Sequence, residues 1–151
     1  MASAIQAPAQ EWVLGLGYAD FSNVKSEDQG MLDLEVHAIP FYERGRFQAG
    51  WAGAVSVHFN GDFFIGAGMS GMLALKGGWF LEGSVMPGYY HPSTPLNDLG
   101  SDFEIRSLMG VGYTLKSGDR LSLAFTHKSN GGTSSVNPGV NAVEVRLRKQ
   151  F

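Results

Sequence analysis

The feature that most constrains this chain is an alternation of apolar side chains with polar or small ones, repeated along nearly its whole length. In the segment 47–59, Phe47, Trp51 and Val57 share one parity, whereas Ser56 and His58 share the other. Successive side chains on a β-strand point to opposite faces of the sheet, so a period of two residues is typical of strands. The sequence therefore predicts an all-β protein without helices.

The alternating segments number eight, and loop or turn sequences separate them. They cover residues 12–19, 32–39, 47–59, 63–75, 79–89, 103–114, 120–129 and 141–150. Asn60-Gly61 is typical of a tight hairpin, and a short turn at residues 42–46 joins the second and third strands. An even number of antiparallel strands closes naturally into an up-and-down barrel. We expect residues 1–151 to form this single domain.

The length and facing of the strands favour a membrane barrel. Strands of about 10–14 residues are longer than the 5–6 typical of soluble proteins and suit a tilted membrane strand of about 9–11. The parity opposite the apolar one carries charges of both signs, which suits the narrow lumen of an eight-stranded barrel. These charged residues are Asp33, Glu35, Glu82, Glu104, Arg106, Glu144, Arg146 and Arg148. The expected fold is an eight-stranded antiparallel up-and-down transmembrane β-barrel.

The connections and the last residue favour the bacterial outer membrane. Three of the four connections at one end are long, at residues 20–30, 91–101 and 131–139, whereas those at the other end are short. This asymmetry is expected of outer-membrane barrels, in which the long loops face outward. The terminal Phe151 on an alternating strand also resembles the recognition signal of bacterial outer-membrane proteins.

Composition excludes several classes of function and partner. The chain has no Cys, so it has no disulfide, thiolate metal site or Cys nucleophile. The histidines lack paired ligand spacing, and we expect neither a metal nor another cofactor. The net charge of −3 argues against a nucleic acid partner. The first residues lack a basic stretch followed by an apolar run, so no signal peptide is expected in this sequence.

Two reactive side chains share one face at the end of the seventh expected strand. His127 and Ser129 have the parity of Leu121, Leu123 and Phe125, which places them on the lipid side near the external rim. Polar residues on a lipid face are costly and need a reason. A base and a hydroxyl side by side form an activated nucleophile, and the facing implies a lipid ester as substrate. We also expect that Ser129 pairs with Asn141, which would place His127 diagonal to that amide.

The sequence His127-Lys128-Ser129-Asn130-Gly131-Gly132, followed by Asn137-Pro138-Gly139-Val140-Asn141, resembles the lipid A 3-O-deacylase family of the PagL type. The strand layout fits this family along nearly the whole chain, and the specific motif covers its last quarter. The resemblance implies an outer-membrane barrel that hydrolyses the 3-O-linked acyl chain of lipid A in lipopolysaccharide. It assigns catalysis to His127 and Ser129, and the oxyanion site to Asn130 and Gly132. We expect outer-membrane lipids to surround the protein. We also expect the protein to be a monomer or a homodimer.

The third catalytic residue departs from the family pattern. The position of the family's Glu falls on Asn141, which can still accept a hydrogen bond from imidazole and hold its orientation. Glu144 is the alternative third member, although its parity points to the lumen, where we expect it to pair with Arg146 or Arg106. A bulge near Gly139 would reverse that facing.

Two other functions remain open from the sequence. One is a non-catalytic eight-stranded outer-membrane barrel with a structural or adhesive role, which would use its long loops as the working surface. The other is a soluble, lipocalin-like carrier.

Overall fold

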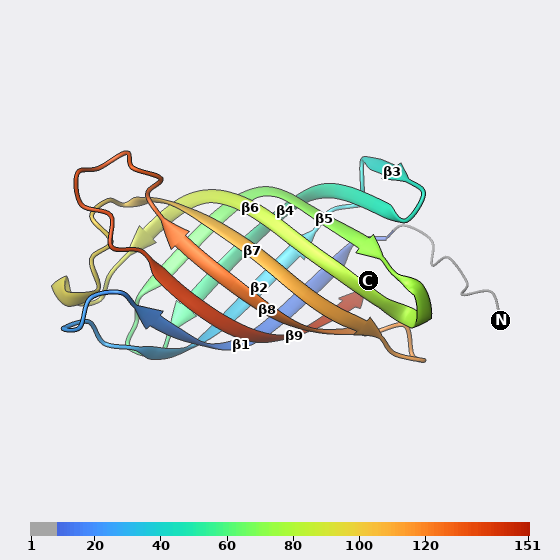
Figure 1. Ribbon diagram of the computed structural model, residues 1–151, viewed down its shortest axis with the longest axis horizontal. Coiled ribbons are helices and arrows are strands. Elements are labelled where there is room, and N and C mark those ends of the chain that lie inside the picture. Colours follow the sequence, from blue (N-terminus) through green and yellow to red (C-terminus); the bar gives the residue numbers. More distant parts are fainter. Residues whose placement is uncertain (1–8) are drawn as a thin grey trace.

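The computed structural model describes residues 9–151, which form a closed barrel of tilted strands (Figure 1). The expectation that the first residues contain no signal peptide lies outside the described residues. The long strands are β1 (Glu11–Phe21), β2 (Gln29–His37), β4 (Phe47–His58), β5 (Phe63–Ala74), β6 (Trp79–His91), β7 (Phe103–Thr114), β8 (Arg120–Ser129) and β9 (Val140–Gln150). Each pairs antiparallel with the next along the chain, and β1 pairs with β9. Pairing of β2 with β4 completes the sheet, which confirms the expected eight-stranded barrel.

The expected turn between the second and third long strands contains a further short strand. Strand β3 (Tyr42–Arg44) folds back on the start of β4. The other additions are two 3-10 helices, η1 (Lys76–Gly78) and η2 (Pro95–Asn97), which lie in connections. Within residues 9–151, no helix is long and apolar enough to cross a membrane.

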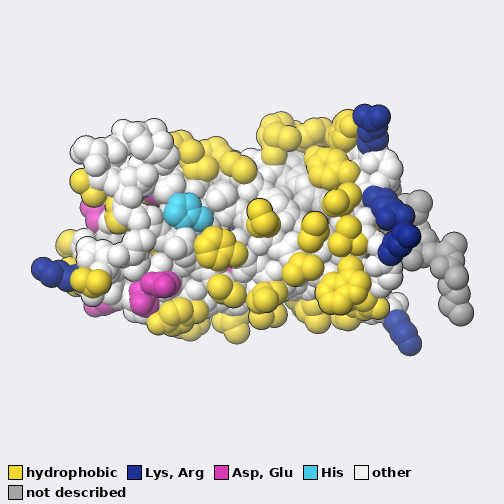
Figure 2. Space-filling model, viewed as in Figure 1, with side chains coloured by type: hydrophobic (Ala, Val, Ile, Leu, Met, Phe, Trp, Pro, Cys, Tyr) yellow, Lys and Arg dark blue, Asp and Glu magenta, His cyan; other side chains and the backbone are white. Residues whose placement is uncertain are grey.

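The barrel has the reversed polarity that the sequence predicts. Outward-facing Leu16 keeps 58% of its surface exposed, whereas lumenal Arg146 keeps 1%. Hydrophobic side chains cover the wall of the barrel, and basic side chains gather near the end where β1 begins and β9 ends (Figure 2). Aromatic pairs lie near both ends of the wall, with ring centroids 5.4 Å apart for Trp79 and Tyr113 and 5.9 Å apart for Phe63 and Tyr89. Such an apolar band between aromatic girdles matches a bilayer and its two interfaces.

A network of buried ion pairs fills the middle of the lumen. Arg146 binds both carboxylate oxygens of Glu35, each at 2.9 Å, and its Nη1 lies 3.2 Å from Glu144. Arg106 pairs with Asp33 and Glu35 from the opposite wall. Pairing of this kind is what allows charges to remain away from water. His37 and His58 also point inward, as expected, and His37 lies 2.7 Å from Glu35.

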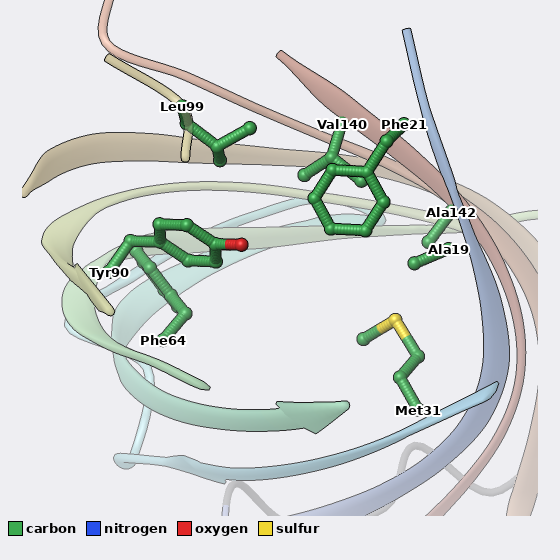
Figure 3. Close-up of a cluster of buried hydrophobic side chains, with 8 residues drawn as sticks. All are labelled: Ala19, Phe21, Met31, Phe64, Tyr90, Leu99, Val140 and Ala142. Carbon is green, nitrogen blue, oxygen red and sulfur yellow. The ribbon is translucent and has the colours of Figure 1, made fainter. Parts of the chain in front are cut away.

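An apolar cluster occupies the lumen near its outer end (Figure 3). Phe64 and Tyr90 pack from β5 and β6, and Phe21 lies opposite them on β1. Leu99, from the β6–β7 connection, joins the cluster, while the Tyr90 hydroxyl donates to the carbonyl of Asn97 at 2.9 Å. The β6–β7 connection therefore packs against side chains at the outer end of the lumen.

Asp62 ties these loops together. Its Oδ1 accepts from the amide of Ser93 at 2.6 Å, and its Oδ2 accepts from Asn97 Nδ2 at 2.7 Å. The Asn97 amide oxygen in turn accepts from the backbone of Glu27 at 2.8 Å. Burial alone raises the pKa of Asp62, but the His58 imidazole, whose Nδ1 lies 3.4 Å from Asp62 Oδ2, and hydrogen bonds from Asn97 and Ser93 outweigh it and hold that pKa below its ordinary value.

Candidate active site

The outward face of β8 changes from apolar to polar toward the external loops. Leu121, Leu123 and Phe125 are exposed to the membrane side, and His127 and Ser129 follow on the same face with partly exposed side chains. The alternation of the strand therefore places both predicted residues where the sequence analysis expects them.

Strand pairing brings His127 to Asn141 by a different register from the expected one. Asn141 lies directly opposite His127 rather than opposite Ser129, and Ser129 pairs instead with Ile105 on β7. The expected register is wrong by two residues, which preserves the facing of every side chain. The correction brings the imidazole and the amide closer, and His127 Nδ1 lies 2.7 Å from Asn141 Oδ1.

This hydrogen bond determines which imidazole nitrogen can act as a base. An amide oxygen only accepts hydrogen bonds, so the proton of a neutral imidazole lies on Nδ1. The lone pair then lies on Nε2, the nitrogen remote from Asn141. Ser129 stands two residues along the same face, although no hydrogen bond joins its hydroxyl to His127 among the described residues. Catalytic hydrogen bonds are often absent or long before substrate binds.

The groups expected at the oxyanion site are engaged within the loop that follows β8. The Asn130 side chain is buried and donates to the carbonyls of Leu99 and Val136 at 3.2 and 2.7 Å. Its Oδ1 accepts from the amide of Gly132 at 3.0 Å. Asn130 therefore organises the loop, and both expected donors are already occupied in this conformation.

Glu144 lies on the other side of the barrel wall from His127. Its side chain is buried in the lumen and faces Arg146 and, at 3.6 Å, Arg106. Strand β9 is continuously paired with β8 from Val140 to Arg148, so no bulge reverses its facing. Glu144 is thus the lumenal partner of Arg146 and Arg106, as expected from its parity. The barrel wall separates its carboxylate from the His127 imidazole.

Two further polar residues extend the site sideways across the barrel wall. Ser107 on β7 pairs with His127, and Asp20 on β1 pairs with Asn141. All four therefore form one row across four neighbouring strands, which we call the rim row. The sequence analysis missed both additions, because it placed Asp20 in a loop and gave Ser107 no role. The parity of Leu14, Leu16 and Tyr18 continues to Asp20 and could have indicated it.

Sequence comparisons relate the chain to a family of enzymes. The profile of the family described as "Lipid A 3-O-deacylase (PagL)" matches residues 9–150. A segment of 53 residues is 34% identical to the lipid A deacylase PagL of Bordetella bronchiseptica. That segment covers 35% of this chain and 30% of the relative, so it spans less than one third of that protein.

Solved structures share the fold. The crystal structure of the outer membrane enzyme PagL matches with a TM-score of 0.71 at 14% identity, covering 93% of this chain and 99% of that one. Neisserial surface protein A matches with a TM-score of 0.59 at 11% identity, covering 94% and 96%. At these identities the structures support the architecture alone. Together with the family match, they confirm the expected outer-membrane β-barrel.

Proposed function

Because this chain belongs to the lipid A 3-O-deacylase (PagL) family, we propose that it hydrolyses the 3-O-linked acyl chain of lipid A, with Ser129 as nucleophile and His127 as general base. The observation that carries the proposal is the 2.7 Å contact of His127 Nδ1 with Asn141 Oδ1 on the membrane-facing side of the barrel. A charge-neutral orienting contact of this kind is found in Cys-His-Asn enzymes.

The reaction follows from the protonation state of the imidazole. His127 Nε2 takes the proton of the Ser129 hydroxyl as Oγ bonds to the ester carbonyl carbon. The tetrahedral intermediate collapses when the sugar 3-oxygen leaves and takes that proton from His127. Water then attacks the acyl-enzyme with His127 again as base, which releases the fatty acid and restores Ser129.

The position of the site supports a membrane lipid as the substrate. Phe125 and Val143 flank His127 and Asn141 toward the middle of the barrel wall, and both are exposed on its apolar band. An ester of an outer-leaflet lipid lies at this depth, between its acyl tails and its head group. Lipid A presents its ester-linked acyl chains at that level, so the substrate can reach Ser129 without leaving the membrane.

The loop after β8 is the element that would supply the oxyanion donors. Gly132 presents its amide to Asn130 Oδ1, and Asn130 is held by Leu99 and Val136. We assign the oxyanion contact to Gly132, whose amide would turn from Asn130 to the substrate oxygen when the ester binds. Asn130 would then position this loop. Asn141 orients His127 and stabilises the imidazolium through the dipole of its amide.

Mass spectrometry of lipid A from cells expressing the protein tests the proposal. We expect the lipid to lose one ester-linked acyl chain, and Ser129→Ala to abolish that loss. Ser107→Ala is the matched control, because Ser107 is the hydroxyl that pairs with His127 from β7 on the same face. Loss of activity in Ser107→Ala but not in Ser129→Ala would show that the nucleophile is assigned to the wrong strand. An unchanged lipid A in cells with the folded wild-type protein would contradict the function itself.

A further inference from the structure

Asp20 lies on the membrane-facing side of β1, where a carboxylate is unusual. It continues the exposed series Leu14, Leu16 and Tyr18 at the outer end of the strand, and it is itself exposed. Acidic and histidine side chains appear on the same face of the molecule, between the apolar band and the external loops (Figure 2). At the outer edge of a lipid face a carboxylate costs at most about 1 kcal/mol, so Asp20 can be kept there beside the site.

The rim row places Asp20 behind the amide that orients His127. Asn141 is the direct partner of His127 on one side and of Asp20 on the other. Directly opposed side chains on one face have Cβ atoms about 5 Å apart. The Asn141 oxygen is taken by His127 Nδ1, and its NH2 group makes no hydrogen bond among the described residues. An amide NH2 is a donor only, and Asp20 is the carboxylate paired with it on the adjacent strand, although no hydrogen bond joins the two side chains among the described residues.

A carboxylate in this position would compensate for the missing charge in the third catalytic position. When His127 takes the Ser129 proton it becomes an imidazolium, which a neutral amide stabilises only by its dipole. A carboxylate that accepts from the NH2 group polarises the amide and makes its oxygen a stronger acceptor. It also places a negative charge two strand spacings, about 10 Å, from the imidazolium.

We propose that Asp20 is a positioning residue that completes a Ser129-His127-Asn141-Asp20 relay across three strands. The inference rests on the proposed deacylase function and names the source of negative charge for that site. Asp20 makes no contact with the substrate, and it acts on the reaction only through Asn141.

Steady-state kinetics of the purified full-length protein with lipid A in detergent micelles tests the relay. We expect Asp20→Asn to lower kcat about tenfold with little change in KM, because a charge at this distance acts on the transition state. Asp20→Glu should retain most of the activity. Glu27→Gln is the matched control, since it removes one negative charge from the same external rim without facing Asn141. Wild-type kcat in Asp20→Asn would overturn the relay.

A double-mutant cycle separates the relay from a structural role of Asp20. Asn141→Glu places a carboxylate directly against His127, which makes the remote charge unnecessary and sets two like charges opposite each other. Asp20→Asn should therefore raise kcat in the Asn141→Glu background, although it lowers kcat in the wild type. An equal loss in both backgrounds would overturn the relay and assign Asp20 to folding. If the two substitutions fail to couple but Ser129→Ala still abolishes hydrolysis, the proposed function stands without the relay.

Discussion

Gly139 lies against the imidazole of His127, across the join between the last loop and β9. A Cβ at position 139 would stand 3.0 Å from His127 Cε1 and 3.2 Å from the carbonyl oxygen of Lys128. The backbone of Gly139 has a φ of +69°, in the left-handed region that favours glycine. Glycine at this position therefore both turns the chain into β9 and leaves room for the ring that Asn141 holds.

Gly139→Ala should lower deacylation about tenfold or more, because a ring displaced by a fraction of an ångström loses its alignment with Ser129. The measurement is the rate of acyl release from lipid A in micelles. Gly45→Ala is the control, since Gly45 has a similar φ of +62° but nothing within 4 Å of its Cβ position. Both variants carry a backbone strain of about 1–2 kcal/mol, and only the first presses on His127. Equal rates in the two variants would contradict the role of this contact.

Asn141→Ala should lower kcat on the order of 100-fold, because His127 loses both its orientation and its fixed tautomer. Glu144→Gln should keep kcat close to that of the wild type, since its carboxylate pairs with Arg146 in the lumen. Single-turnover deacylation of both variants decides which residue completes the site. The opposite order of losses would restore Glu144 as the third member.

Arg146→Met should destabilise the barrel by about 3–5 kcal/mol, because it leaves buried carboxylates without their partner. The free energy of unfolding can be measured by urea titration of the protein in lipid vesicles. Lys149→Met is the matched control: its ammonium lies 3.6 Å from Asp119 at the exposed end of the barrel, where a pair contributes about 0–1 kcal/mol. Similar losses in both variants would show that the lumenal network adds little to stability.

The ties around Asp62 should loosen in acid. Since its pKa is lower in the folded protein than the unfolded value of about 3.9, this carboxylate stabilises the loops fully above that value. The contribution is lost as pH falls from there through the folded pKa. Hydrogen exchange of the Ser93 amide, corrected for its intrinsic rate, should therefore accelerate below about pH 4. In Asp62→Asn this acid-dependent step should disappear, and its persistence would point to another group.

The facing of the strands could be predicted from sequence, because the pleat imposes a period of two wherever one side meets lipid and the other meets charges. Leu123 and Phe125 face outward, whereas Glu144 and Arg146 face inward, as that period requires. The same period places His127 and Asn141 on one surface of the barrel.

The register between β8 and β9 could not be predicted, because a shift of two residues leaves every facing unchanged. The loop decides it: Asn137 accepts from the amide of Asn130 at 3.1 Å, and Gly139 turns with a positive φ. The hydrogen bond from the Gly132 amide to Asn130 Oδ1 depends on the same folded loop. The sequence therefore could not predict that the expected oxyanion donors are already bonded within this loop. The outward-facing apolar residues of β1 end at Tyr18, although the strand continues to Phe21. The sequence pattern therefore assigns Asp20 to the loop that follows rather than to the strand.

The apolar cluster below the external loops has an electrical consequence. Phe21, Phe64 and Leu99 lie across the outer end of the lumen, where the buried ammonium of Lys128 stands 5.9 Å from the centre of the Phe64 ring. Beneath it, Arg106 and Arg146 pair with Asp33 and Glu35, which fixes these charges in place. An ion that enters the outer end of the lumen therefore meets hydrocarbon and fixed charges, an arrangement that opposes conduction through the barrel.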